Sequence, residues 1–180
     1  MDSLIETPRL RLRPLSEDDA EFILELLNQP SFLHFIGDRG VRTLDDARSY
    51  IYNKILLSYD THGFGLYKVE QKSEPIPMGI AGFVKRAVLD YPDVGFAFLE
   101  SFWARGYAYE SSAAMIHHGR TRLRMDRILG VTSPTNQSSI RLLEKLGLRF
   151  ERMIQLPGLA AEQKLFSTPE PETLEEVRSS

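Results

Sequence analysis

The decapeptide FWARGYAYES, residues 102–111, stands between two apolar stretches of different character. Before it, VGFAFL at 94–99 is short and rich in β-forming residues, whereas AAMI at 113–116 is typical of a helix. The sequence therefore predicts a strand, a tight turn at Gly106 and the beginning of a helix. Backbone N–H groups at a helix start have no partner within the helix and, together with the helix dipole, favour an anion.

The turn itself carries small residues and has basic residues around it. Gly106 tolerates a positive φ and lets a ligand approach the backbone closely. The side chain of Ala108 is small enough to allow a second close approach. Arg105 and Arg120 are expected to add positive charge nearby. Two adjacent anionic groups, as in a pyrophosphate, would suit such a turn. Neither a Walker motif nor G-x-G-x-x-G is present, so a plain strand-to-helix turn is the alternative interpretation.

Composition narrows the class of protein. The 180 residues, 42% of them hydrophobic, suit one domain with a real core. The sequence has no cysteine, which excludes disulfides and a thiol nucleophile, and its four histidines have no metal-site spacing. A net charge of -3 does not favour a nucleic-acid partner, although residues 105–152 are basic. No apolar run approaches the roughly 20 residues of a membrane span, and the start lacks a signal-peptide pattern, so we expect a cytoplasmic protein.

Other segments alternate between strand and helix patterns. A mixed sheet covered by helices fits this order. Helices are expected to begin at Ser16, Thr43, Gly106 and Asn136, with a loop at 30–40. We expect one domain over residues 1–168 and an acidic, flexible tail over 169–180. The predicted strands are 9–15, 63–69, 78–84, 94–99, 127–133, 150–156 and 163–167.

The segment TNQSSIRLLEKLG, residues 135–147, predicts a short helix with clear ends. Asn136 is the expected N-cap, Ser139 falls in the first turn, and Gly147 stands where a left-handed C-terminal cap belongs. Ile140, Leu143 and Leu146 are expected to face inward.

Three motifs together resemble a known family. WARGYAYES, followed by SPTNQSSIRLLEKLGL and preceded by ETPRLRLRPLSEDDAEFI, is similar to the GNAT superfamily of acyl-CoA N-acyltransferases. It looks most like the RimJ/RimL-type branch, which acetylates protein N-termini, and the similarity covers roughly residues 4–166. The resemblance implies an α+β fold with a mixed, mostly antiparallel central sheet, helices on its faces and two splayed central strands. It also implies acetyl-CoA as co-substrate and no metal.

The resemblance assigns the coenzyme A contacts. Phe98 and Leu99 match the backbone positions that pair with pantetheine, and Asn136 would contact the same arm. Trp103 replaces the usual polar residue at the start of the loop motif, and we expect its ring to pack in the core. The pyrophosphate would lie on the backbone N–H groups of a cradle formed by Arg105, Gly106, Tyr107, Ala108 and Tyr109.

The resemblance also suggests a thiol-side group. Ser139 would lie near the sulfur and protonate the departing thiolate. Many relatives have a tyrosine for this role at the position of Leu143. Leucine cannot donate a proton, so Ser139 is the better candidate here. The alternative is that Asn136 and Ser139 only complete a helix cap, and both roles are compatible.

Asp93 matches an acidic position common in this branch. It could relay a proton from the amine through water or attract the ammonium group, and the alternative is an exposed carboxylate at a strand entry. Glu100 and Glu110 are second choices.

The resemblance implies an acetyl-CoA-dependent N-acetyltransferase. Because the sequence has no cysteine and no evident activated nucleophile, direct attack in a ternary complex is the simpler mechanism. A protein or peptide N-terminal α-amine is the favoured acceptor. A small-molecule amine (polyamine, amino acid or drug) and a non-catalytic acyl-CoA-binding module remain alternatives. We expect no membrane partner and no nucleic acid, and both a monomer and a homodimer stay open.

Overall fold

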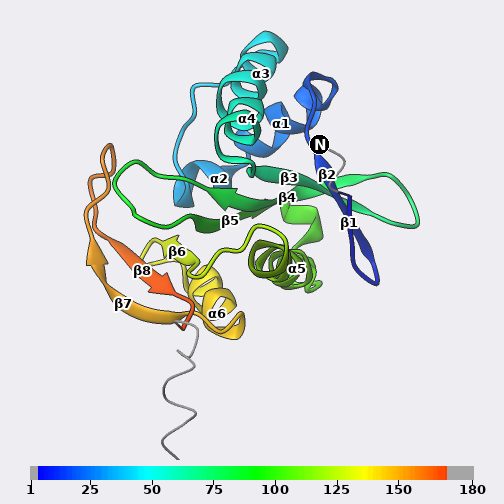
Figure 1. The fold of residues 1–180 in the computed structure, drawn as a ribbon. Helices are drawn as coiled ribbons and strands as arrows, with labels where there is room; N and C mark the ends of the chain where they lie inside the picture. Colours follow the sequence, from blue (N-terminus) through cyan, green and yellow to red (C-terminus); the bar gives the residue numbers. More distant parts are fainter. Residues whose placement is uncertain (1–3, 170–180) are drawn as a thin grey trace, which may run out of the picture.

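The computed structural model describes residues 4–169, whose strands form one eight-stranded sheet (Figure 1). The strand order is β1-β2-β3-β4-β5-β6-β8-β7. Every neighbouring pair is antiparallel except β5 and β6, which are parallel. The strands are β1 (Ile5–Glu6), β2 (Leu10–Pro14), β3 (Leu66–Gln71), β4 (Pro77–Val84), β5 (Asp93–Phe98), β6 (Leu129–Thr132), β7 (Arg149–Ile154) and β8 (Gln163–Ser167).

Helices cover both faces of this sheet. Helices α1, α3 and α4 lie over one face, and α5 and α6 lie against the other (Figure 1). The α-helices are α1 (Ala20–Leu27), α2 (Pro30–Phe35), α3 (Leu44–Tyr50), α4 (Leu57–His62), α5 (Tyr107–Thr121) and α6 (Gln137–Lys145). Three further segments are helical: η1 (Glu17–Asp19) and η3 (Glu100–Phe102) are 3-10 turns, and η2 (Ile51–Leu56) is a π-helix. The predicted α+β architecture is confirmed.

The predicted helix starts are confirmed at two caps. The Ser16 backbone N–H donates to Asp19 Oδ2 at 3.0 Å, and the Asp46 backbone N–H donates to Thr43 Oγ1 at 3.1 Å. Both satisfy backbone groups that a helix start leaves without partners. The predicted apolar stripe of α1 is buried in the core, and it consists of Phe22, Ile23, Leu26 and Leu27.

Two boundaries differ from the sequence prediction. The segment 30–40 is not wholly a loop, because α2 begins at Pro30, whose missing N–H costs nothing in the first helical turn. Strand β3 begins at Leu66 rather than at residue 63. Gly63 instead adopts φ 74 and ends α4, its N–H donating to the Tyr59 carbonyl at 2.9 Å.

The predicted splay of two central strands is confirmed between β5 and β6. Their parallel pairing is limited to Asp93 opposite Leu129, where the Leu129 N–H donates to the Pro92 carbonyl at 2.9 Å. On its other side β6 pairs with β8 from Leu129 to Thr132. Strand β5 therefore loses its β6 partner from residue 94 onward.

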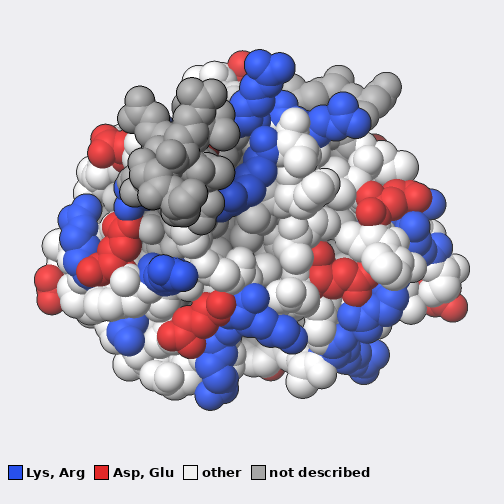
Figure 2. Space-filling view, turned by 60° about the horizontal axis from the view of Figure 1, so that its bottom comes forward, with Lys and Arg blue, Asp and Glu red and all other residues white. Residues whose placement is uncertain are grey.

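Charges of both signs are interspersed on the surface drawn in Figure 2, with no single continuous basic field on that face. Within the basic segment 105–152, Arg127 pairs with Glu151. In the part of the chain that the structure describes, none of the helices combines the length and apolar character that crossing a bilayer needs.

Candidate active site

The loop between β5 and α5 exposes the start of a helix. Ala104 adopts φ 58 and Gly106 adopts φ 80, two left-handed residues that turn the chain into α5. Gly106 is the N-cap and supplies no side-chain cap, and the first helical backbone bond runs from Glu110 N–H to the Gly106 carbonyl at 3.0 Å. Within residues 4–169 the backbone N–H groups at positions 107–109 therefore have no hydrogen-bond partner. This arrangement suits a pyrophosphate.

Of the two basic residues expected near this loop, Arg105 lies there and Arg120 does not. Arg120 lies in the last turn of α5, about 20 Å along the helix from the loop, so the expectation that it adds charge there is wrong. The Arg105 guanidinium lies 5.9 Å from the centre of the Phe102 ring. Arg9, which sequence reasoning missed, donates from Nη1 to the Arg105 carbonyl at 3.0 Å. No local pattern could reveal this contact, because 96 positions separate the two residues.

Trp103 does not pack in the core as expected. The residue is 48% exposed, and its indole Nε1 donates to the Phe98 carbonyl at 2.9 Å. The indole N–H requires an acceptor, and the end of β5 supplies one just before the loop. Trp103 therefore ties the loop to the strand that precedes it.

The two predicted pantetheine positions differ in where their backbone groups point. The Leu99 N–H donates to the Met78 carbonyl at 2.9 Å and so belongs to the ladder with β4. Hydrogen-bonded and non-hydrogen-bonded pairs alternate in an antiparallel ladder. Phe98, opposite Gly79, therefore turns its N–H and carbonyl away from β4, toward the side where β6 has separated. The carbonyl already accepts the Trp103 indole N–H, so the Phe98 N–H is the group that faces a ligand there. Of the two positions, this geometry favours Phe98 for pairing with an extended ligand.

Helix α6 follows β6 on the other side of the splay and begins as the sequence predicts. Asn136 Oδ1 accepts a hydrogen bond from the Ser139 backbone N–H at 3.1 Å. The Ser139 hydroxyl makes no hydrogen bond to any other group within residues 4–169, so it is available to a ligand. Leu143 is buried and packs on β6, since a Cβ added to Gly130 would lie 2.7 Å from Leu143 Cδ2.

Asp93 lies where β5 and β6 still pair, and it is 2% exposed. The alternative interpretation, an exposed carboxylate at a strand entry, is therefore wrong. Arg86 engages both carboxylate oxygens, from Nε at 2.8 Å and from Nη2 at 3.2 Å. Burial raises the pKa of Asp93 above its ordinary value, while the Arg86 charge opposes this shift. Asp93 remains a candidate for handling a proton, and its geometry also supports a role in fixing the point of splay.

The two second-choice carboxylates, Glu100 and Glu110, also have hydrogen-bond partners. Glu100 is exposed and accepts a hydrogen bond from the Ser31 backbone N–H of α2 at 3.3 Å. Glu110 pairs with Arg9 at 2.7 Å. Burial would raise the pKa of Glu110, but hydrogen bonds from Thr7 and Arg9 outweigh it and hold the pKa below the ordinary value. Glu110 is therefore a weak base.

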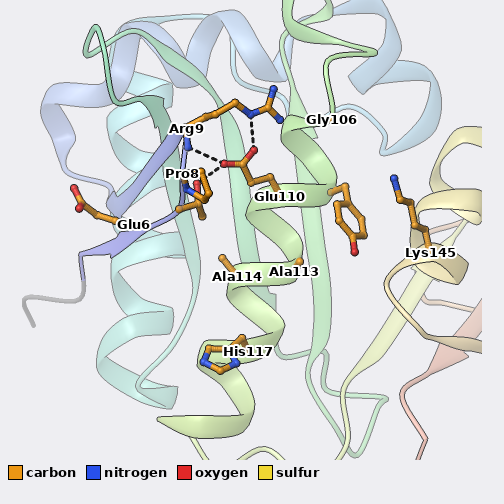
Figure 3. A pocket seen from close by; sticks show the side chains of 11 residues that line it. Glu6, Pro8, Arg9, Gly106, Glu110, Ala113, Ala114, His117 and Lys145 are labelled. Carbon is orange, nitrogen blue, oxygen red and sulfur yellow. Dashed lines mark hydrogen bonds and ion pairs between the residues drawn. The ribbon is translucent and has the colours of Figure 1, made fainter.

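A shallow hollow of about 640 Å³ runs along the outer side of α5 (Figure 3). Gly106 and Arg9 lie at its upper end, Ala113 and Ala114 form its middle, and Lys145 of α6 faces it from the other side. The Lys145 Nζ lies 4.4 Å from the centre of the Tyr109 ring, so this contact links α5 to α6. Among the described residues, no group of three or more His, Asp or Glu side chains could hold a metal ion.

Comparison with known proteins identifies the family. Residues 9–149 match the family model described as an acetyltransferase (GNAT) domain. An uncharacterized N-acetyltransferase of Bacillus subtilis, YoaA, is 26% identical over 156 residues, which cover 86% of this chain and 88% of YoaA.

Solved structures agree in fold. RimL, a ribosomal L7/L12 alpha-N-protein acetyltransferase in complex with coenzyme A, has a TM-score of 0.77 at 19% identity and covers 92% of this chain and 97% of its own. The ribosomal-protein-S5-alanine acetyltransferase of Vibrio fischeri has a TM-score of 0.77 at 17% identity, over 95% and 98% of the two chains. These two likenesses establish the fold, and the family model spans most of the sequence. The chain therefore belongs to the GNAT family of N-acetyltransferases, which use acetyl-CoA.

Proposed function

We propose that this protein transfers the acetyl group of acetyl-CoA to a protein or peptide N-terminal α-amine, by direct attack in a ternary complex. The observation that carries the proposal is the pairing of two features at one end of β5. The uncapped start of α5 offers free N–H groups at 107–109, and the Phe98 backbone edge faces the splay beside it. The first suits a pyrophosphate, and the second suits the amide groups of pantetheine.

Each part of the site has a separate proposed role. The N–H groups of Tyr107, Ala108 and Tyr109 bind the pyrophosphate, with Arg105 and Gly106 shaping the loop. Phe98 pairs with pantetheine, and Asn136 lies at the α6 start across the splay. As the amine nitrogen attacks the thioester carbonyl, the C–N bond forms and the nitrogen releases a proton to water. The C–S bond then breaks and the thiolate takes up a proton. Ser139 is the proposed donor of that proton.

The chemistry of the amine supports an α-amine acceptor. An α-amino group has a reference pKa of about 7.7–8.0, against about 10.4 for lysine, so a useful fraction is neutral near pH 7 without a strong base. Asp93 and Glu110 are both held in ion pairs, to Arg86 and Arg9 respectively. A substrate that needs little help with deprotonation fits this site. The names of the RimL and ribosomal-protein-S5 neighbours point to the same class of acceptor.

A panel of amines tests the proposal. Purified protein is supplied with acetyl-CoA, and release of free thiol is followed with peptides that carry a free α-amine and no lysine. The same peptides blocked at the N-terminus but carrying one lysine, spermidine and free amino acids complete the panel. We expect the free α-amine peptides to give the highest kcat/KM. Preference for spermidine or an amino acid would favour the small-molecule alternative. Acetyl-CoA binding without turnover on any amine would favour the non-catalytic module.

A further inference from the structure

The turn between β1 and β2 reaches the start of α5, although more than 100 positions separate the two segments. Glu110, in the first turn of α5, accepts three hydrogen bonds from this turn. They come from Thr7 Oγ1 at 2.6 Å, the Arg9 backbone N–H at 2.9 Å and Arg9 Nε at 2.7 Å. The Glu110 side chain is only 16% exposed. An ionised Glu110 in this setting keeps the Arg9 guanidinium beside the loop.

Two further contacts fix the orientation of that guanidinium. Its Nη1 donates to the Arg105 carbonyl at 3.0 Å, and its Cζ lies 4.6 Å from the centre of the Tyr107 ring. A planar guanidinium held by hydrogen bonds on two sides and by a ring on its face loses most of its freedom before any ligand arrives.

One nitrogen of the Arg9 guanidinium, Nη2, is available to a ligand. This nitrogen makes no hydrogen bond to any group within residues 4–169. A Cβ added to Gly106 would lie 3.4 Å from this Nη2, so the unused N–H groups lie beside the residue that opens α5. Figure 3 shows the guanidinium above Glu110 at this end of the helix. The free backbone N–H groups at positions 107–109 follow directly.

We propose that Arg9 binds the pyrophosphate of acetyl-CoA through Nη2, and that Glu110 is the positioning residue that holds Arg9 in place. This inference rests on the proposed function, because it assigns a charged ligand to the same donor site. Backbone N–H groups supply only partial charges, whereas a guanidinium brings a full positive charge and donors spaced for phosphate oxygens. The turn between β1 and β2 thereby becomes part of the cofactor site.

The test compares ligands that share or lack the phosphates. Arg9→Met is measured by calorimetry with coenzyme A and with 3′-phosphoadenosine 5′-diphosphate, which keeps the phosphates and lacks pantetheine. We expect both dissociation constants to rise about tenfold or more, the loss typical of a charge-assisted hydrogen bond. Turnover with S-acetylpantetheine, which has no phosphate, should stay within about twofold of the unmodified protein.

Arg11→Met is the matched control. Arg11 lies in β2, two residues beyond Arg9, is similarly exposed and pairs with Glu6 at 3.4 Å rather than with the loop. It should leave both dissociation constants unchanged. Glu110→Gln, which keeps the size of the side chain but removes its charge, should weaken coenzyme A binding and spare S-acetylpantetheine. If Arg9→Met does not fold, Arg9→Lys carries the same comparison, because lysine keeps the charge but cannot make all three contacts at once.

Two results would overturn the inference. One is an equal loss with S-acetylpantetheine and with coenzyme A, which would mean that Arg9 only supports the fold. The other is unchanged coenzyme A affinity in a folded Arg9 variant. Failure of the proposed function would look different. The unmodified protein would then acetylate no α-amine peptide, but the change in coenzyme A affinity on Arg9→Met would still test the role of Arg9.

Discussion

At the scale of single residues, the loop before α5 depends on a backbone conformation that a side chain would disturb. Gly106 has φ 80, and a Cβ there would lie 3.4 Å from Arg9 Nη2. Left-handed φ costs a residue other than glycine roughly 1–2 kcal/mol. A bulky side chain would also cover the N–H groups that follow. Glycine at this position therefore serves both the turn and the proposed ligand.

Gly106→Val is predicted to weaken acetyl-CoA binding at least about tenfold, or about 1.4 kcal/mol. Calorimetry with acetyl-CoA measures this. Gly147→Val is the control, because Gly147 has a similar φ of 88 in open space at the end of α6. Similar affinity losses in the two variants would contradict a direct role for the loop.

Ser139→Ala is predicted to lower kcat about 100-fold, as expected for loss of a general acid, with little change in the KM for acetyl-CoA. The melting temperature should not change, since the Ser139 hydroxyl bonds to no other group within residues 4–169. Steady-state kinetics and a thermal melt check both parts, with the neighbouring exposed Ser138→Ala as control. An unchanged kcat would remove Ser139 from the chemistry and leave Asn136 with its role as helix cap.

At the scale of elements, a buried ionic cluster joins η1 to strands β2 and β3. Lys68 Nζ contacts Asp19 Oδ1 at 2.8 Å and also pairs with Glu70. Arg13 pairs with Asp19 at 3.1 Å and with Glu70 at 3.2 Å. Both carboxylate side chains are 7% exposed, so each relies on its cations. The cluster fixes the start of α1 against the sheet.

The cluster predicts how stability depends on pH. Burial would raise the pKa of Asp19, but hydrogen bonds from Lys68, Ser16 and Arg13 outweigh burial and lower it. The stabilisation is therefore present above the unfolded-state pKa of about 3.9 and is lost as the pH falls through the lower folded-state pKa. Asp19→Asn should reduce the free energy of unfolding at pH 7 by about 3 kcal/mol and flatten its fall below pH 4.

Denaturant unfolding at pH 7 and at several values below pH 4 measures both effects. The control is Asp18→Asn, an exposed carboxylate in the same turn. An acid dependence that is equally steep in the Asp19 variant would show that other carboxylates govern it.

At the scale of the whole molecule, the sheet is held together at its middle by little direct pairing. Strands β1 to β5 form one antiparallel run, and β6, β8 and β7 form another, with Asp93 and Leu129 at their junction. Acetyl-CoA, the proposed acetyl donor, would lie between these two runs. It would therefore replace, in part, the strand pairing that the splay leaves out.

Acetyl-CoA is accordingly predicted to stabilise the entire chain. At 100 times its dissociation constant, linkage gives about 2.7 kcal/mol, or a rise of roughly 5–10 °C in the melting temperature for a chain of this size. A thermal melt with increasing acetyl-CoA checks the shift, and hydrogen exchange should show slower exchange in β5. Gly106→Val at the same ligand concentrations should shift less. A melting temperature that does not depend on acetyl-CoA would contradict the assigned site.

The sequence by itself determined the local features of this protein. The caps at Ser16, Thr43 and Asn136 involve bonds that span three residues, and the glycines at 106 and 147 set turns within their own segments. Such features depend on neighbouring residues alone, so a pattern can reveal them. The motif order also sufficed to indicate the family and the splayed sheet.

Only the tertiary structure decided which distant side chains meet. It brought Arg9 to the loop before α5, buried Asp93 against Arg86, left Trp103 exposed and inserted β8 between β6 and β7. These outcomes depend on strand order and on how the turn between β1 and β2 packs against α5. The charged groups around the proposed site come from segments about 100 positions apart, and folding alone brings them within hydrogen-bond distance.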